Sequence, residues 1–158
     1  MTAPATLGEW RWRRFDALTA RELHDLLKLR CDVFVVEQAC AFAEIDGRDP
    51  AALHLLCELD GVLAGCLRVF APEASGGAAR IGRVATARAF RGAGLGHRLM
   101  AEALRLCAER WPASAVELSA QAHLASFYGR HGFTSVSDAY LEDDIAHVDM
   151  RRAAPVAA

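Results

Sequence analysis

Long hydrophobic runs and an excess of basic residues are both missing from this chain of 158 residues. No stretch approaches the roughly 18 consecutive apolar residues that a membrane-spanning helix needs, so the sequence argues against a membrane protein. Residues 1–8 lack the basic start and the apolar run of a signal peptide, and we therefore expect a cytoplasmic location. A formal net charge of −2 gives no support for a basic nucleic-acid-binding surface.

Paired cysteines are missing as well. The cysteines are odd in number and contain no C-x-x-C motif, so neither a disulfide framework nor a zinc site is indicated. We expect small buried thiols at Cys31, Cys40, Cys57, Cys66 and Cys107. The histidines show no H-E-x-x-H or comparable spacing, and the sequence therefore predicts no metal site.

The composition that remains is that of one folded domain. Hydrophobic residues make up 53% of the chain and charged residues 24%, which is an ordinary balance for a globular protein. A chain of this length fits a single hydrophobic core. We expect one domain over residues 9–152, with flexible tails at residues 1–8 and 153–158.

The first half of the chain predicts a strand, a helix and a loop. Glu9–Phe15 alternates as a strand does. Thr19 and Glu22 have the spacing of a capping box, which predicts a helix start. The apolar stripe of that helix is read as Leu23, Leu26, Leu27, Arg30, Cys31 and Phe34. Glu37–Pro50 contains an Asp-Gly and an Asp-Pro pair and is predicted to be a surface loop.

The second half predicts strands with helices between them. Asp60-Gly61 is a strong hairpin signal and should join a strand at Leu53–Leu59 to one at Val62–Phe70. The further elements are a strand at Arg80–Thr86, a helix at Leu95–Arg110, a strand at Val116–Gln121, a helix at His123–His131, and strands at Phe133–Val136 and Ile145–Met150. This order predicts the α+β class, with a mixed, largely antiparallel sheet and helices on both of its faces.

A glycine-rich turn, Arg91-Gly92-Ala93-Gly94-Leu95-Gly96-His97-Arg98, lies between a predicted strand and a predicted helix. Amides at a helix start lack internal partners, and glycines let a phosphate approach the backbone, so the turn is suited to a pyrophosphate. Three alternating glycines also serve a tight turn that binds nothing. The turn lacks the Gly-Lys-Ser/Thr of a Walker loop, and His97 stands where a dinucleotide fingerprint needs glycine.

The sequence resembles the GNAT N-acetyltransferases. Arg91-x-x-Gly94-x-Gly96 after a strand and before a helix resembles the coenzyme A signature of that family, and the element order matches along nearly the whole chain. Residues 30–38 (RCDVFVVEQ), 46–47 (DG), 81–84 (IGRV) and 120–124 (AQAHL) are similar to its ElaA-like branch. The resemblance implies a GNAT-like fold whose central strands are splayed around the coenzyme A arm.

The resemblance also implies where acetyl-CoA, the co-substrate, would bind. Val84, Ala85 and Thr86 would pair with the pantetheine arm, and the Thr86 amide would act as oxyanion donor to the thioester carbonyl. Main-chain amides from Arg91 to His97 would hold the pyrophosphate, with the guanidinium groups of Arg91 and Arg98 available to it. Gly82 is consistent with the bulge that the splayed strand requires. Arg88 stands where relatives often have proline.

Two further cofactor contacts and a general acid follow from the same resemblance. Tyr128 matches the family's tyrosine that gives a proton to the departing thiolate. Gln121 stands where many relatives have asparagine, and its longer amide can make the same bonds to pantetheine. Phe127 is assigned to the cofactor site beside them. Taken without the glycine turn, Phe127, Tyr128 and Phe133 would be read as core aromatic residues.

The acceptor side is less defined by the sequence. A primary amine is mostly protonated at neutral pH, so a base must remove a proton before it attacks. Glu37 or His123 is our candidate base, with Glu44, Asp46 and Asp143 as further groups that could supply one. Gln38, Glu142 and His147 are the candidate acceptor-binding residues. An acyl carrier role for Cys31 or Cys40 has no supporting pattern.

The function expected is acetyl transfer from acetyl-CoA to a primary amine by direct attack in a ternary complex. The alternative is a non-catalytic acyl-CoA-binding regulatory domain, and a third possibility is a nucleotide-binding protein. The acceptor stays open among small metabolites, polyamines, amino sugars, lysine side chains and peptide amines. Family members commonly pair, so a homodimer is one assembly that the resemblance allows.

Overall fold

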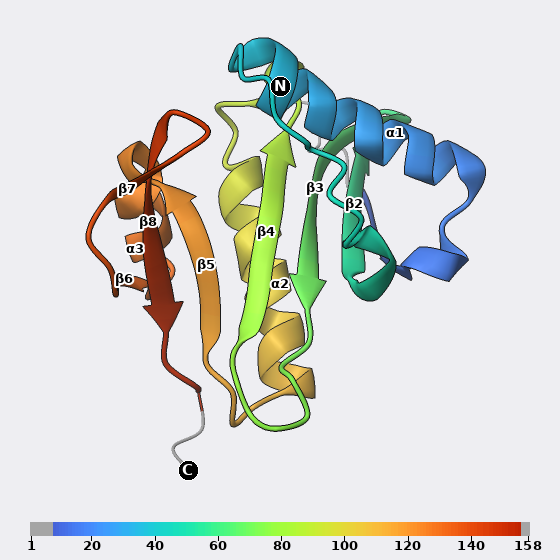
Figure 1. The fold of residues 1–158 in the computed structure, drawn as a ribbon. Coiled ribbons are helices and arrows are strands. Elements are labelled where there is room, and N and C mark those ends of the chain that lie inside the picture. Colours follow the sequence, from blue (N-terminus) through green and yellow to red (C-terminus); the bar gives the residue numbers. More distant parts are fainter. Residues whose placement is uncertain (1–7, 156–158) are drawn as a thin grey trace, which may run out of the picture. The chain divides into compact units, whose positions relative to one another are not determined.

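The computed structural model describes residues 8–155, which divide into two units along the chain (Figure 1). Within these residues, unit 1 consists of residues 8–68 and 83–99, and unit 2 consists of residues 69–82 and 100–155. Two strands and one helix contribute residues to both units. Of the tails expected at residues 1–8 and 153–158, residues 1–7 and 156–158 lie outside the described residues.

Unit 1 contains four hydrogen-bonded strands in the order β1-β2-β3-β4. They are β1 (Glu9–Arg14), β2 (Leu53–Leu59), the start of β3 (Val62–Phe70) and the end of β4 (Ala79–Thr86). β1 and β2 pair antiparallel, with Trp10 opposite Cys57 and Trp12 opposite Leu55. Asp60 and Gly61 have φ values of 52° and 75°, as a two-residue type I′ turn requires, and the predicted hairpin of β2 and β3 is confirmed.

Helix α1 (Ala20–Cys31) begins at the predicted capping box. The Glu22 amide donates to Thr19 Oγ1 at 3.0 Å, and the Thr19 amide donates to Glu22 Oε1 at 3.0 Å. These two bonds satisfy backbone donors that the first helical turn leaves without intrahelical partners. The cap therefore fixes where the helix starts.

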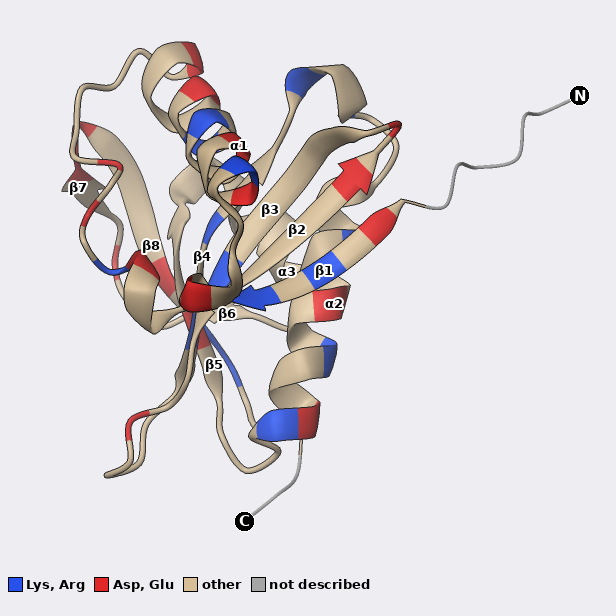
Figure 2. Ribbon diagram, turned by 90° about the vertical axis from the view of Figure 1, so that its right-hand side faces the viewer, with Lys and Arg blue, Asp and Glu red and all other residues tan. Residues whose placement is uncertain are grey.

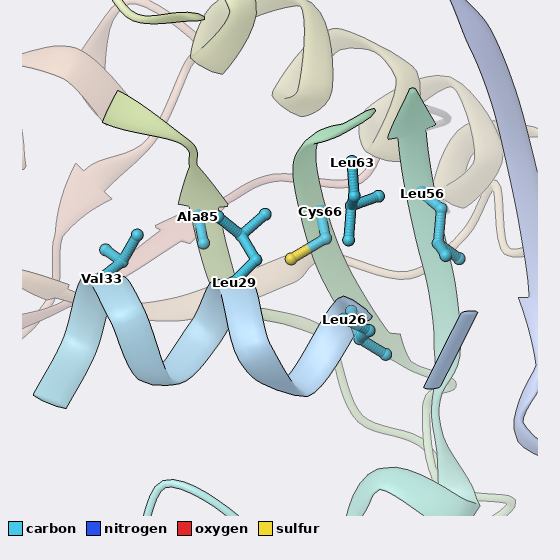
Figure 3. Close-up of a cluster of buried hydrophobic side chains, with 7 residues drawn as sticks. All are labelled: Leu26, Leu29, Val33, Leu56, Leu63, Cys66 and Ala85. Carbon is cyan, nitrogen blue, oxygen red and sulfur yellow. The ribbon is translucent and has the colours of Figure 1, made fainter. Parts of the chain in front are cut away.

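The buried side of α1 packs on the sheet of unit 1 and forms an apolar cluster (Figure 3). The cluster consists of Leu26, Leu29, Val33, Leu56, Leu63, Cys66 and Ala85. Gly65 and Cys66 are successive strand residues, so Gly65 points to the face opposite Cys66. A Cβ on Gly65 would lie 2.9 Å from Leu99 Cδ1 of helix α2 (Leu95–Arg110). In unit 1, helices therefore cover both faces of the sheet, as predicted.

The sequence prediction of one regular helix through Phe34 is wrong. A π-helical segment, η2 (Asp32–Glu37), follows α1 and changes the spacing of buried positions. Val33 is buried, whereas Phe34 is only half-buried. The buried residues of α1 are Leu26, Leu29 and Arg30.

The prediction that Glu37–Pro50 is a surface loop is also wrong in part. The side chains of Glu44 and Asp49 are buried, with residue exposures of 3% and 4%. Two carboxylates can be buried here because arginines from α1 and β3 reach them, as described below. Phe15, expected to end the first strand, instead begins a 3₁₀ turn.

Unit 2 contains β5 (Val116–Gln121) and β8 (Ile145–Arg152), which pair antiparallel from Val116–Arg152 to Gln121–His147. β6 (Thr134–Ser135) and β7 (Tyr140–Glu142) both pair antiparallel with β8. β4 pairs with β5 in parallel at Ala79–Val116 and Arg80–Glu117. Ile81 and Gly82 continue β4 without a partner on β5 in this register, so the expected separation of the two strands begins there. The sheet is mixed and mostly antiparallel, as predicted.

The end of the chain departs from the predicted elements in three places. The helix expected at residues 123–131 is a 3₁₀ turn at Ala122–Leu124 followed by α3 (Ala125–Gly129). The strand expected at residues 133–136 is limited to β6. β7 was not predicted, although Asp143 and Asp144, with φ values of 50° and 62°, make the two-residue turn that joins it to β8.

All five cysteines are free. Cys57, Cys66 and Cys107 are buried, as expected, whereas Cys31 and Cys40 are only half-buried, so the prediction of buried thiols is wrong for these two. Burial raises the pKa of Cys66 to about 12 and that of Cys107 to about 11, so both stay thiols at neutral pH. Among the residues that the structure describes, no helix combines the length and the apolar character needed to cross a membrane.

Candidate functional site

The glycine turn between β4 and α2 has the backbone conformation that only glycine adopts readily. Gly92 and Gly94 have φ values of 91° and 79°. An L side chain is strained in this left-handed region, which explains glycine at both positions. A Cβ at either residue would have no atom within 4 Å, so the backbone of the turn is open to a ligand. The turn therefore leaves room for a ligand at both glycines, and the phosphate site expected here stays a prediction.

The start of α2 completes the expected phosphate site. The Arg98 amide donates to the Gly94 carbonyl at 3.1 Å, which begins the helical ladder. Amides of the first helical turn carry the positive end of the helix dipole. The Leu95 side chain is buried in unit 1, so this residue offers its backbone and not its side chain. Ala93 is exposed, and Gly96 and His97 are half-buried.

The end of β4 carries the expected pantetheine segment and is joined to the glycine turn by a 3₁₀ turn, η4 (Arg88–Phe90). Ala85 is buried in the α1 cluster, whereas Val84 and Thr86 are half-buried. The irregularity expected at Gly82 is found at Arg83, which has a φ of 52°, and Gly82 is not left-handed. A left-handed residue other than glycine costs about 1 kcal/mol or more. Such strained residues concentrate at functional sites.

Arg91 of the turn is held by a carboxylate from η2. Its Nη1 and Nη2 atoms donate to Oε1 and Oε2 of Glu37, the second at 2.7 Å. Nη2 also donates to the Thr86 carbonyl at 2.9 Å. The hydrogen bonds from Arg91 lower the pKa of Glu37. A carboxylate paired in this way is a weak base, and the paired guanidinium is shared between Glu37 and any phosphate.

The other two arginines near the turn differ in how far their guanidinium groups are already in contact with other side chains. The Arg98 guanidinium lies over the Trp10 ring, 5.2 Å from its centroid, in a cation–π contact. The side chain of Arg88 is 86% exposed, and its Nε lies 3.9 Å from Glu37 Oε1. Figure 2 shows acidic and basic segments interspersed along β1 and α1 of unit 1.

Several charged side chains of unit 1 contact one another, and we call this network the charge hub. Its members are Arg30, Glu44, Asp46, Asp49, Arg68 and Arg83. Arg30 Nε donates to Glu44 Oε1 at 2.6 Å, and Arg30 Nη1 donates to Asp49 Oδ1 at 2.7 Å. Arg68 Nη2 donates to Asp46 Oδ2 at 2.6 Å. The hub thus anchors the loop that the sequence had placed on the surface.

Burial and pairing act in opposite directions on the hub. Burial opposes the charge on Arg30, but hydrogen bonds to Asp49 and Glu44 raise its pKa. Burial likewise opposes ionisation of Asp49, and the hydrogen bonds from Arg30 and Arg68 lower its pKa. The Arg68 hydrogen bond is the main cause that lowers the pKa of Asp46. All three groups therefore stay charged at neutral pH.

Sequence reasoning placed Arg30 on an apolar stripe and did not identify the hub. The contacts within the hub join residues that are 14, 19 and 39 positions apart in the chain. An arginine in an otherwise apolar helix stripe was the one local signal, because a fully buried guanidinium needs carboxylate partners. Glu44 and Asp46 were weighed only as sources of a base.

A surface pocket of about 370 Å³ lies beside η2 in unit 1. It is lined by Leu29, Asp32, Val33, Val36, Glu37, Ala87 and Arg88. Its walls are therefore mainly aliphatic, and its charged groups are Asp32 and Glu37 of η2 and Arg88, which follows β4. Gln38, expected to contact the acceptor, follows η2 directly and is half-buried.

Tyr128 lies on α3 in unit 2, with 8% of its surface exposed. Its ring makes edge-on contacts with Phe127, at 5.0 Å between centroids, and with Phe133, at 6.2 Å. Burial raises the pKa of Tyr128 to about 12. The phenol is therefore protonated at neutral pH, which a proton donor needs.

The remaining predicted site residues gather at one end of β5 and β8 in unit 2. Gln121 is opposite His147 in the register of the two strands. His147 Nε2 lies 3.9 Å from Glu142 Oε2, so the two expected acceptor residues are neighbours. The His147 ring stacks on the Tyr140 ring at 6.1 Å between centroids. The sequence analysis missed Tyr140, whose hydroxyl donates to Asp149 Oδ1 at 2.6 Å.

His123 belongs to the 3₁₀ turn that follows β5 and is exposed. It lies two positions after Gln121, at the end of the strand, as expected. In the described part of the chain, no group of three or more histidine, cysteine or acidic residues has the arrangement of a metal site.

Comparisons with known proteins agree with this geometry. Residues 22–154 match the family model of the acetyltransferase (GNAT) domain. The chain is similar to an acyl-CoA N-acyltransferase of Pseudomonas aeruginosa, with 47% identity, a TM-score of 0.88, and coverage of 92% of this chain and 99% of that one. It is also similar to the structure of ElaA of Escherichia coli, with 38% identity, a TM-score of 0.86 and the same coverage. A UPF0039 protein of Mycobacterium tuberculosis is 44% identical over 85% of this chain and 86% of its own length.

Proposed function

This chain belongs to the GNAT acetyltransferase family, in its ElaA-like branch, and from that premise we propose that it transfers an acetyl group from acetyl-CoA to a primary amine. Acyl transfer from an acyl-CoA is the general chemistry of the family. The acetyl donor and the amine acceptor are the parts that we propose. The observation that carries the proposal is the turn after β4, where Gly92 and Gly94 are left-handed and open to a ligand.

The proposed binding of acetyl-CoA starts at this turn. Backbone amides of residues 91–97 would hold the pyrophosphate, because a helix start and open glycines favour anions. Val84–Thr86 would bind the pantetheine arm along the strand edge, and an amide of this segment, expected to be that of Thr86, would donate to the thioester oxygen. Gln121 and Phe127 are proposed as further contacts to the arm. The function is assigned to residues 9–152 as a single domain.

The proposed reaction is a direct transfer. The neutral amine attacks the thioester carbonyl carbon, a C–N bond forms, and the C–S bond breaks. The nitrogen loses a proton to a base, and the coenzyme A thiolate accepts a proton from the Tyr128 hydroxyl. Because burial raises the pKa of Tyr128 to about 12, the phenolate must recover its proton from water after each cycle.

His123 is the base that we propose over Glu37. The Glu37 carboxylate is engaged by Arg91, which lowers its pKa and weakens it as a base. Imidazole is the side chain most often used for general base catalysis. If His123 is the base, His123→Ala removes the acidic limb of the pH–rate profile, while Glu37→Gln keeps that limb.

Thermal unfolding with acetyl-CoA, coenzyme A, ATP or NADH tests the cofactor. A ligand that binds only the folded protein adds about 2.7 kcal/mol at a hundredfold excess over Kd. We expect stabilisation by acetyl-CoA and coenzyme A. Stabilisation by ATP or NADH without an effect of either coenzyme A species would contradict the proposal and favour a nucleotide-binding protein.

Tyr128→Phe separates an enzyme from a non-catalytic acyl-CoA-binding domain. An enzyme should lose most of its thiol release in the presence of amines and keep its affinity for coenzyme A. A protein that binds acetyl-CoA but releases no thiol with any amine, before or after the substitution, would fit the regulatory alternative.

A further inference from the structure

Arg83 is the one arginine of the charge hub that lacks a well-aligned carboxylate partner. Arg30 and Arg68 each donate hydrogen bonds to two carboxylates. Arg83 makes one hydrogen bond within residues 8–155, from Nη2 to the Glu44 carbonyl at 3.3 Å. Its Nε lies 2.8 Å from Glu44 Oε2, yet both atoms are buried without an aligned hydrogen bond. The guanidinium is therefore close to a negative charge but has bonding capacity left.

The position of Arg83 connects this capacity to the proposed reaction. Arg83 immediately precedes Val84–Thr86, the segment proposed to bind the pantetheine arm. In the proposed binding mode the thioester oxygen accepts from the Thr86 amide, three residues after Arg83 on the same strand. The left-handed backbone, with a φ of 52°, marks Arg83 as a strained residue at this point.

On the basis of the proposed acetyl transfer, we infer that the amine acceptor is a free α-amino acid, whose carboxylate binds Arg83 and whose amino group lies beside Asp46. A guanidinium binds a carboxylate through two parallel hydrogen bonds, which fixes its orientation as well as its charge. Asp46 Oδ2 lies 3.6 Å from Arg83 Nη2, so opposite charges stand side by side as an amino acid zwitterion requires.

The charge balance of the hub supports a zwitterion over other amines. The hub has three arginines and three carboxylates, and a zwitterion adds no net charge to it. Burial lowers the pKa of Arg83; attraction to Glu44 acts against this, and repulsion from Arg68 and Arg30 adds to it. A carboxylate bound at Arg83 offsets these effects, whereas a polyamine would add positive charge beside three guanidinium groups.

A purely structural role for Arg83 is the competing explanation. In that role the contacts of Arg83 with Glu44 and Asp46 hold the loop. Replacing Arg83 would then lower the activity equally for acceptors with and without a carboxylate. The two roles therefore differ in the ratio of activity between matched acceptors.

The test compares L-leucine, L-methionine, L-phenylalanine and L-threonine with the amide of each. Steady-state thiol release from acetyl-CoA gives kcat/KM for both members of a pair. We expect kcat/KM for each amino acid that serves as an acceptor to be about tenfold or more above that for its amide, because a hydrogen bond between charged groups contributes about this much. In Arg83→Met the ratio should approach one through a higher KM for the amino acid, and Arg83→Lys should recover part of it.

Arg80→Met is the matched control on the same strand. Arg80 forms an exposed ion pair with Glu117 at 3.3 Å and should leave the ratio unaltered. Calorimetric titration of the preferred amino acid into the protein saturated with coenzyme A gives a readout independent of turnover. Binding should be seen with the wild type and Arg80→Met and be lost with Arg83→Met.

The outcomes separate this inference from the proposed function. Amides acetylated as well as amino acids, or an equal loss for both in Arg83→Met, overturn the amino acid acceptor and leave acetyl transfer standing. No thiol release with any member of any pair, together with no binding in the titration, overturns both.

Discussion

Helix α1 buries two kinds of side chain, and the contrast between them is instructive. Leu26 and Leu29 enter the apolar cluster, where any neighbour of suitable volume stabilises them. Arg30 enters the charge hub at 1% exposure, where only carboxylates placed within hydrogen-bonding distance can stabilise it. The apolar region depends on volume, and the hub depends on specific partners, so the two should respond differently to substitution, pH and ligands.

Removing the central cation of the hub should have the largest effect. Arg30→Met removes a cationic partner from each of the buried carboxylates of Glu44 and Asp49, and we expect a loss of about 3–5 kcal/mol in the free energy of unfolding. Urea denaturation measures it. Arg105→Met, which breaks an ion pair on the exposed side of α2, is the control and should leave the midpoint nearly unchanged. A loss no larger than that of the control would show that the hub does not hold the fold.

The apolar cluster should lose less when one member is truncated. Leu26→Ala creates a cavity against β2 and β3, and we expect a cost of about 2–4 kcal/mol. Val36→Ala on the neighbouring η2 segment is the control, because its side chain is 72% exposed, and it should change stability by no more than about 0.5 kcal/mol. Equal effects of the two substitutions in denaturation experiments would contradict the packing described for α1.

Of the two regions that α1 enters, only the hub, with His54 in contact with Asp49, should make stability depend on pH. His54 is fully buried and its Nε2 lies 2.9 Å from the Asp49 carbonyl oxygen, and burial lowers its pKa. The unfolded chain takes up this proton first, below about pH 6.5, so the contribution of His54 is present above that pH and is lost as the pH falls. Asp46 and Asp49 also have lowered pKa values, and their contributions disappear only below about pH 4.

Denaturation between pH 3 and pH 8 should therefore show two separate losses in wild type. His54→Gln removes the upper one and keeps the lower one, whereas Leu26→Ala lowers the whole curve without altering its shape. A His54→Gln curve that still falls between pH 7 and pH 5 would rule out His54 as its source.

The glycine turn provides a smaller effect that combines stability with binding. Gly94→Ala places a Cβ on a left-handed residue, at a cost of about 1 kcal/mol. Gly61→Ala in the hairpin of β2 and β3, where φ is 75°, is the matched control for that strain. Both should lower the melting temperature similarly, but only Gly94→Ala should reduce stabilisation by acetyl-CoA. An equal response to acetyl-CoA in both variants would place the cofactor elsewhere.

The smallest effect is expected at the pair of Glu37 and Arg91. Glu37→Gln removes the negative charge beside the turn, so acetyl-CoA affinity should rise a few-fold at low salt and by less at high salt. Equilibrium titration at two ionic strengths measures it. A weaker affinity would mean that Glu37 positions Arg91 for the phosphates and does not compete with them.

Local patterns predicted the parts of the fold that depend on local chemistry. The capping box at Thr19, the hairpin turn at Asp60-Gly61 and the turn at Gly92 and Gly94 were all confirmed, because each needs particular residues at short spacing. The hub was missed because Arg30, Glu44 and Arg68 are distant in sequence and meet only in the folded chain. From the sequence, Gly82 is consistent with a bulge in β4, whereas the left-handed residue of this strand is Arg83.

The candidate site divides in the same way. The residues named for coenzyme A came from a signature of consecutive positions and lie where β4 turns into α2. Glu142 and His147 were named separately, and the hairpin of β7 and β8 makes them neighbours. The pairing of Glu37 with Arg91 joins positions that are 54 residues apart, and neither residue type alone indicates it.

The π-helical segment Asp32–Glu37 sets the direction in which the side chains after α1 point. A π-helix is an α-helix with an inserted residue, and each residue of an α-helix turns the chain by about 100°. Removing a single residue from this segment would restore the α-helical pitch and rotate everything after it by roughly that angle. Glu37 would leave Arg91 while the capping box stayed in place, so the length of the segment, and not only its composition, determines what the turn contacts.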